Sequence, residues 1–116
     1  MSRTDRYEVV LDAGAEDDLR STAAYLAEVY HEDAAAEFVD AVFDRISVLE
    51  RFPGRGSAPK ELEGINRKGY LQVLLGRYRI FYRIIGERVV VVLIADGRRD
   101  MGRLLASRLL APDPPA

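Results

Sequence analysis

The chain has 116 residues, of which 48% are hydrophobic and 31% are charged, and its formal net charge is −2. A chain of this length is expected to form one domain with a single core, too small to add an enclosed cofactor cavity. It contains no cysteine, which excludes disulfides, thiolate chemistry and most structural zinc sites. We therefore expect a surface site that uses neither a metal nor a cofactor.

Charge is distributed unevenly along the chain. Residues 1–52 contain 13 acidic and 5 basic side chains, whereas residues 53–116 contain 6 acidic and 12 basic ones. This split indicates an anionic partner for the basic half, and it equally fits acidic helices that lie against a basic sheet of the same molecule. Both interpretations remain open from the sequence.

The chain begins with a charged segment at 1–6, and strand-like residues follow at 7–11. No apolar stretch approaches the roughly 18 residues that a membrane-spanning helix needs. We expect a soluble, cytoplasmic protein with no membrane partner.

Two helices are predicted next, because apolar residues recur at spacings of three and four. The first can be capped by Asp12 or Gly14, and the second by Asp33. Their apolar stripes consist of Leu19, Ala23, Leu26 and Tyr30 in the first helix and of Phe38, Val42, Ile46 and Leu49 in the second. The helices form an antiparallel hairpin, which the proline- and glycine-rich segment 53–59 ends.

Branched and aromatic residues are dense in three later segments, which we predict to be strands at 70–75, 77–85 and 88–95. Gly76 and the pair Gly86-Glu87 separate them, so short turns and an antiparallel sheet are indicated. Residues 89–94 lack polar alternation, which is typical of a central strand covered on both faces. The predicted fold is α+β, with the helical hairpin packed on a small antiparallel sheet.

A short amphipathic helix is predicted at 101–110, with leucines on one side and Arg103 and Arg108 on another. The proline-rich residues 111–116 predict a disordered tail. No repeat or long linker divides the chain. We therefore expect a single domain over residues 1–110, followed by the tail.

Two arginine clusters are the most informative motifs. Because successive side chains of a strand point to opposite faces, Arg77, Arg79 and Arg83 are predicted on one face of the 77–85 strand, opposite its tyrosines and isoleucines. Arg98 and Arg99 follow the next strand, near the end of the sheet where Arg77 begins. We expect these five arginines to share one concave cationic surface. The alternatives are a solvated sheet face and internal ion pairs with nearby carboxylates.

The order of strand, two helices, loop and three strands, together with three motifs, resembles the RelE/ParE family of toxins from bacterial type II toxin–antitoxin modules. The motifs are Arg51-Phe52-Pro53-Gly54-Arg55-Gly56, Tyr78-Arg79-Ile80-Phe81-Tyr82-Arg83 and Asp96-Gly97-Arg98-Arg99-Asp100. The resemblance covers about residues 7–110. It implies the same α+β fold with a short C-terminal helix.

The resemblance implies one of two activities. RelE-like members cleave messenger RNA in the ribosomal decoding site without a metal, whereas ParE-like members bind and poison DNA gyrase. In the first case Arg79 and Arg99 are the implied catalytic residues, since guanidinium groups stabilise the charge of a phosphate under attack. The predicted target- or RNA-binding residues are Arg77, Arg79, Arg83, Arg98, Arg99 and Lys68.

Groups for proton transfer are scarce in these motifs. Attack by a ribose 2′-hydroxyl needs a proton acceptor and a proton donor, and the pKa of arginine is too high for either role. Lys68 only precedes the 70–75 strand, and Tyr78 is predicted to face the core. The sequence therefore favours binding of gyrase over cleavage of RNA. A third hypothesis is an inactive family member that only binds an antitoxin.

The resemblance also implies a cognate antitoxin as partner. Its predicted contact is an exposed apolar surface on the C-terminal helix, formed by Leu104, Leu105 and Leu109, beside the cationic surface. An acidic amphipathic segment that folds on binding would cover both.

Overall fold

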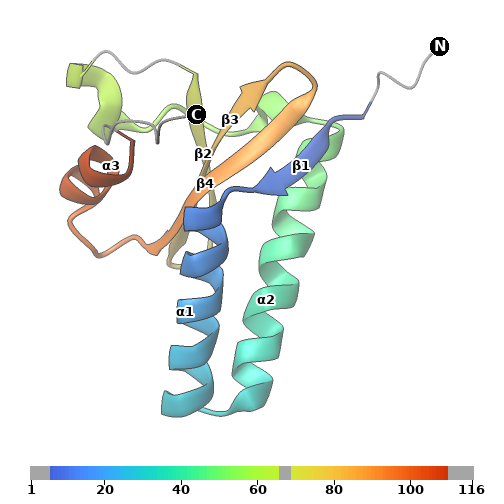
Figure 1. Ribbon diagram of the computed structural model, residues 1–116, viewed down its shortest axis with the longest axis vertical. Helices are drawn as coiled ribbons and strands as arrows, with labels where there is room; N and C mark the ends of the chain where they lie inside the picture. Colours follow the sequence, from blue (N-terminus) through green and yellow to red (C-terminus); the bar gives the residue numbers. More distant parts are fainter. Residues whose placement is uncertain (1–5, 66–68, 110–116) are drawn as a thin grey trace.

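The computed structural model of the chain describes residues 6–65 and 69–109. Two long helices stand against one face of a four-stranded sheet, and a short C-terminal helix lies on the other side (Figure 1). The tail predicted at 111–116 and the end of the predicted domain at residue 110 lie outside the described residues. Within the described residues, no helix is both long and apolar enough to cross a membrane.

The helical hairpin consists of α1 (Ala13–Val29) and α2 (Glu32–Ser47). The Asp12 carboxylate accepts a hydrogen bond from the Ala15 N–H at 2.9 Å, which confirms one of the two predicted caps. The second cap was predicted at Asp33, and this is wrong. His31 is the capping residue, and its Nδ1 accepts a hydrogen bond from the Asp33 N–H at 3.3 Å. Asp33 lies in the first turn instead, where a carboxylate favours the helix N-terminus.

The sheet has the strand order β1-β4-β3-β2. Its strands are β1 (Glu8–Leu11), β2 (Tyr70–Leu75), β3 (Tyr78–Ile85) and β4 (Arg88–Asp96). β2, β3 and β4 form the predicted antiparallel meander. β1 pairs in parallel with β4, so the complete sheet is mixed. The α+β class is confirmed.

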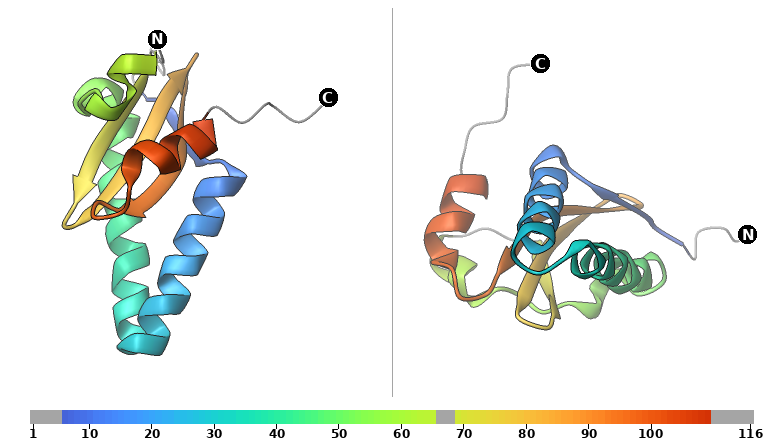
Figure 2. Two further views of the ribbon diagram at one scale, coloured as in Figure 1. Left: turned by 90° about the vertical axis from the view of Figure 1, so that its left-hand side faces the viewer. Right: turned by 90° about the horizontal axis from the view of Figure 1, so that it is seen from below.

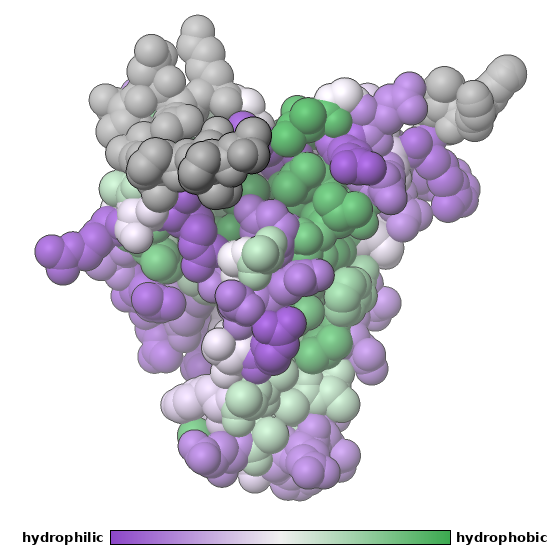
Figure 3. All heavy atoms as spheres, viewed as in Figure 1, coloured by the Kyte–Doolittle hydropathy of each residue, from purple (hydrophilic) through white to green (hydrophobic). Residues whose placement is uncertain are grey.

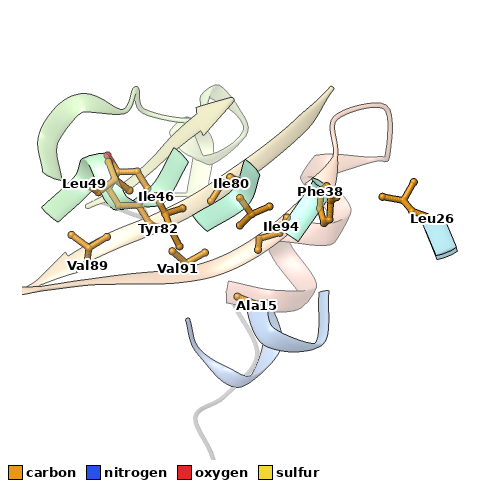
Figure 4. Packing of buried hydrophobic residues seen from close by; sticks show 11 residues of the cluster. Ala15, Leu26, Phe38, Ile46, Leu49, Ile80, Tyr82, Val89, Val91 and Ile94 are labelled. Atoms are coloured by element: carbon orange, nitrogen blue, oxygen red, sulfur yellow. The ribbon is translucent and has the colours of Figure 1, made fainter. Parts of the chain in front are cut away.

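The hairpin covers one face of the sheet and forms the main core with it. The apolar stripe predicted for the second helix is buried there, with Phe38 7%, Val42 0% and Ile46 3% exposed in α2 and Leu49 0% exposed just after it. Figure 4 shows Phe38, Ile46 and Leu49 near Ile80 and Tyr82 of β3 and Val89, Val91 and Ile94 of β4. Burial of this apolar surface provides the main driving force for the hairpin to dock on the sheet.

The opposite face of the sheet is covered as well. A 3-10 helix, η4 (Lys60–Ile65), and the C-terminal helix α3 (Met101–Leu109) lie over it (Figure 2). A second buried cluster contains Phe81, Leu93, Met101 and Leu105. Because β4 carries residues of both clusters, the prediction of a central strand covered on both faces is confirmed.

The loop between the hairpin and the sheet contains two short 3-10 helices, η2 (Val48–Glu50) and η3 (Pro53–Arg55), and it is fixed to the sheet by Tyr82. The Tyr82 hydroxyl donates to the Pro53 carbonyl at 2.7 Å and accepts from the Gly56 N–H at 2.9 Å. A Cβ atom on Gly56 would lie 2.5 Å from the Gln72 carbonyl oxygen, so only glycine fits there. The predicted Pro-Gly loop is therefore packed tightly against β2 and β3.

Candidate functional site

A hollow of about 600 Å³ opens between α1 and the ends of β3 and β4. Residues of α1 form one wall, and the turn after β4 together with the start of β3 forms the other. We call it the arginine pocket. Its lining residues are Asp18, Ser21, Thr22, Tyr25, Arg77, Tyr78, Ile94, Ala95, Asp96, Arg98 and Arg99.

Asp96 organises the arginine side of this pocket. Its Oδ1 accepts the Arg98 backbone N–H at 2.9 Å, and its carbonyl oxygen accepts the Arg99 N–H at 3.1 Å. Its Oδ2 lies 3.2 Å from Nε of Arg77 and 3.1 Å from Nη2 of Arg98. Hydrogen bonds from Arg98 are the main reason that the pKa of Asp96 is lowered. One carboxylate thus fixes the turn that carries both terminal arginines.

The pocket keeps an excess of positive charge. Arg77 and Arg98 share the single carboxylate of Asp96, and Arg99 forms no salt bridge with any of the described residues. The other carboxylate in the pocket, Asp18, is already paired with Arg108. Since guanidinium groups bind carboxylates and phosphates through paired hydrogen bonds, the pocket is suited to an anionic group.

Asp18, which lines the pocket from α1, forms an ion pair with Arg108 of α3. We call this pair the Asp18–Arg108 clasp. The two side chains form paired hydrogen bonds of 2.9 and 3.0 Å, and Asp18 Oδ2 also accepts the Ile94 N–H of β4 at 2.9 Å. Arg108 in turn donates to the Val92 carbonyl at 2.9 Å. The hydrogen bonds with Asp18 raise the pKa of Arg108.

The clasp was not predicted, because the sequence analysis assigned Arg108 only to the basic side of the C-terminal helix. The local sign of it is Gly14, a residue of low helix propensity in the first turn of α1. A Cβ atom at this position would lie 2.8 Å from Nη1 of Arg108. Gly14 therefore leaves room for the guanidinium, and the clasp connects α1, β4 and α3.

Arg79 does not lie in the arginine pocket. Its guanidinium forms two hydrogen bonds of 2.8 Å with the Glu61 carboxylate of η4, and its Nε donates to Gln72 at 2.7 Å. The guanidinium also lies 4.9 Å from the centre of the Phe81 ring. The hydrogen bond with Arg79 is the main cause that lowers the pKa of Glu61 from 4.5 to about 2. Arg79 is thus engaged in a mostly buried ion pair, with 15% of its side chain exposed.

The expectation that five arginines share one concave surface is therefore wrong. Arg77, Arg98 and Arg99 are brought together, whereas Arg79 is covered by η4 and Arg83 lies over the Tyr70 ring at 5.5 Å. Alternation placed Arg79 correctly on the face that carries Phe81, but this face is a second core. It was wrong for Arg77, which lies in the turn before β3 and lines hollows together with residues of the hairpin. Internal pairing, the alternative interpretation, holds for Arg79 with Glu61 and for Arg77 with Asp96. Lys68 lies outside the described residues.

The expectation of an exposed apolar surface on the C-terminal helix is also wrong. Leu105 is 0% exposed and Leu109 is 9% exposed, because both pack into the second core beneath η4 and α3. Leu104 is half-buried beside them. In the described conformation, these leucines hold α3 on the sheet.

The arginine pocket is poorly equipped to transfer protons. Its lining, as far as the structure describes the chain, contains neither histidine nor lysine, and a carboxyl with the lowered pKa of Asp96 is a weak base. His31, the single histidine of the sequence, caps α2. Tyr78 lines the pocket at one edge, but its ring also packs on Phe38 at 4.8 Å, so it is only partly the core residue that was predicted. The described lining is suited to an anionic group and offers little for proton transfer.

Comparison with known families shows to which family the chain belongs. Residues 9–101 match the family described as the ParE toxin of the type II toxin–antitoxin system parDE. The chain belongs to the ParE toxin family. It is a type II toxin of the RelE/ParE superfamily, and the resemblance inferred from its motifs is confirmed.

Solved structures share the fold of this toxin at low sequence identity. A chain from the chromosomal ParDE system of P. aeruginosa aligns with a TM-score of 0.66 and 13% identity, over 79% of this chain and 97% of that one. The RelBE2 toxin–antitoxin complex of Mycobacterium tuberculosis gives 0.54 and 22%, over 83% and 97%. A doubly substituted E. coli RelE toxin in the free state gives 0.59 and 12%, over 91% and 99%. No curated protein matches the sequence.

Proposed function

We propose that this toxin arrests growth by binding DNA gyrase through the arginine pocket, without cleaving a substrate. The observation that carries the proposal is a cluster of arginines with no adjacent group suited to proton transfer among the described residues. The match to the ParE family supports the same choice, because ParE-like members act on gyrase. Gyrase is a cytoplasmic enzyme, so we place the action of the toxin in the cytoplasm.

The state of Arg79 gives further support to binding over cleavage. The RelE-like hypothesis assigns this residue to the stabilisation of phosphate charge, which requires a guanidinium that a phosphate can reach. Here Glu61 and Gln72 already take up the Nε, Nη1 and Nη2 donors of Arg79. An RNA phosphate would have to displace the Glu61 carboxylate from a mostly buried pair, which is costly because it leaves a charge uncompensated.

We also propose a cognate antitoxin as partner, as the solved ParDE and RelBE2 systems suggest. Since the leucines of α3 are covered, the antitoxin needs another apolar surface. Figure 3 shows apolar side chains gathered over β1 and the adjoining part of α2. A hollow of about 660 Å³ lies there, lined among others by Val9, Leu11, Leu19 and Phe43. β1 is also an edge strand, which a partner segment can extend by main-chain hydrogen bonds.

The test is induced expression in bacteria without the antitoxin. Wild type is compared with Arg98→Ala/Arg99→Ala, and with Arg103→Ala as a matched change of an exposed arginine outside the pocket. We expect growth arrest with DNA-damage signalling and intact transcripts for wild type and Arg103→Ala, and loss of arrest for the double variant.

Two other results would point to the remaining hypotheses. New ribosome-dependent RNA ends that vanish in the double variant would establish an endoribonuclease and reject the gyrase proposal. Absence of arrest in wild type, with the toxin folded and able to bind its antitoxin, would identify an inactive family member.

A further inference from the structure

The arginine pocket adjoins an apolar hollow that the proposed function does not use. This second hollow has a volume of about 430 Å³ and lies between the helical hairpin and the β2–β3 turn. Tyr30, Leu26, Phe38 and Leu75 contribute to its lining, and its charged lining residues are Glu37 and Arg77. Arg77 and Tyr78 line both hollows, so they form the wall between them.

Contacts with neighbouring side chains fix the positions of Arg77 and Tyr78 between the two hollows. The guanidinium of Arg77 lies 5.5 Å from the centre of the Tyr78 ring, and the Tyr78 ring packs on Phe38 at 4.8 Å. Asp96 holds Arg77 from the other side at 3.2 Å. The two hollows therefore have fixed positions relative to one another, which favours recognition of a partner with little reorganisation.

Large apolar side chains are exposed around this pair of hollows. Tyr25, which lines the arginine pocket, is 54% exposed, and Tyr30, which lines the apolar hollow, is 63% exposed. Figure 1 shows why, because the hairpin extends well beyond the sheet and nothing covers its far half. Exposed tyrosines beside arginines are the composition of protein-binding hot spots. Apolar surface of this kind, next to a cationic pocket, marks an interaction site.

We propose that the two hollows form one docking surface for an amphipathic protein segment that presents a carboxylate next to a large apolar side chain. The carboxylate binds Arg98 and Arg99, and the apolar side chain enters the hollow beside Tyr30. The inference rests on the proposed function in taking the protein target of the toxin, rather than its antitoxin, as the source of this segment.

Charge favours a protein segment over a nucleic acid. The hairpin near the apolar hollow carries Glu28, Glu32, Asp33 and Glu37, which repel a continuous polyphosphate. A peptide can place one carboxylate at the arginines and only apolar groups along the hairpin. The apolar hollow also offers no cation for a second phosphate other than Arg77, which Asp96 already holds.

The first measurement uses the full-length toxin and two labelled helical peptides. One peptide carries glutamate and leucine side by side on one face, and the other carries lysine in place of each glutamate. We expect fluorescence anisotropy to show binding of the glutamate peptide at least about tenfold tighter than the lysine peptide, since one charge-assisted pair is worth this much. Equal binding of the two peptides, no binding of either, or displacement by a short DNA duplex would overturn the proposal.

Variants then locate the contact on the molecule. Tyr30→Ser and Arg99→Gln are each expected to weaken binding of the glutamate peptide about tenfold. Phe43→Ser is the matched control, because Phe43 is 48% exposed on α2 but lines the separate hollow beside β1. Unchanged binding in Tyr30→Ser, or an equal loss in Phe43→Ser, would overturn the assignment.

Gyrase supercoiling and antitoxin binding, measured with the same proteins, separate this inference from the proposed function. Inhibition of gyrase by wild type but not by Tyr30→Ser supports both. Equal inhibition by the two proteins rejects the docking surface while the proposed function stands. Failure of wild type to inhibit gyrase, with peptide binding intact, rejects the proposed function alone. A matching loss of antitoxin affinity in Tyr30→Ser would assign the surface to the antitoxin and overturn our choice of occupant.

Discussion

Single carboxylates determine what the arginines of this toxin can do. Glu61 occupies Arg79, whereas Asp96 holds Arg77 and Arg98 together and leaves Arg99 unpaired among the described residues. Arg79 is one of the two arginines that the RelE-like hypothesis assigns to catalysis, and it has a structural role here. We propose that the arginines that follow β4 bind the anionic group of the partner.

The Glu61 carboxylate should give the stability of the toxin a measurable pH dependence. Its pKa is lowered from 4.5 to about 2 in the folded protein, chiefly by Arg79. A lowered carboxyl pKa stabilises the folded state above the ordinary pKa, and this contribution is lost as the pH falls toward the folded-state value. We expect the thermal unfolding midpoint of wild type to fall between about pH 5 and pH 2 more steeply than that of Glu61→Gln.

Glu63→Gln is the control for this measurement, because it changes an exposed carboxyl of the same 3-10 helix. It should keep the pH dependence of wild type. Parallel curves for wild type and Glu61→Gln would contradict the importance of the Glu61–Arg79 pair.

At the scale of single residues, the sequence indicated on which face of a strand a side chain lies, but not which other side chain it pairs with. Strand alternation placed Arg79 correctly, but which carboxylate meets it depends on η4, eighteen residues earlier in the chain. Phe81, two residues on from Arg79, was the available sign that this face is covered. Local periodicity does not report such long-range pairs.

The position of α3 depends on the Asp18–Arg108 clasp as well as on its buried leucines. We expect Arg108→Ala to lower the free energy of unfolding by about 3 kcal/mol. The substitution leaves the Asp18 carboxylate, whose side chain is only 16% exposed, without a counter-charge. Hydrogen exchange in α3 should accelerate as the helix detaches more often. Denaturant titration and amide exchange measure the two effects.

Arg103→Ala tests whether the effect is specific to the clasp. Arg103 lies on the same helix and is exposed, so its loss should change the stability by less than about 0.5 kcal/mol. Comparable losses in Arg103→Ala and Arg108→Ala would indicate a general effect of charge on α3 and would reject the clasp.

Among the helices and strands, those whose apolar residues recur at a regular spacing could be predicted from the sequence, and the others could not. The buried stripe of α2 and the three antiparallel strands follow from spacing alone. The α1 stripe was correct for Leu26, which is buried, but wrong for Tyr30, which follows the helix and is 63% exposed. The parallel pairing of β1 with β4 joins segments about 80 residues apart, which no local pattern encodes. η4 is a 3-10 helix of six residues without a clear apolar period, yet it closes the second face.

At the scale of the whole molecule, the interpretation of the uneven charge as internal pairing holds in part, and an anionic partner stays a prediction. The Asp18–Arg108 clasp joins the acidic N-terminal half to the basic C-terminal half within one molecule. Arg98 and Arg99 remain exposed at the pocket and are available to a partner. The sequence could predict the asymmetry, but not which arginines are used internally.

The function that we propose for the arginine pocket is the binding of gyrase without cleavage of a substrate. Its most direct test is a titration of purified gyrase with wild-type toxin, Arg98→Ala/Arg99→Ala and Arg103→Ala in a supercoiling assay. We predict that wild type and Arg103→Ala inhibit at similar concentrations, and that the double variant needs at least about tenfold more protein. Equal inhibition by all three proteins, or none by wild type, would contradict the account.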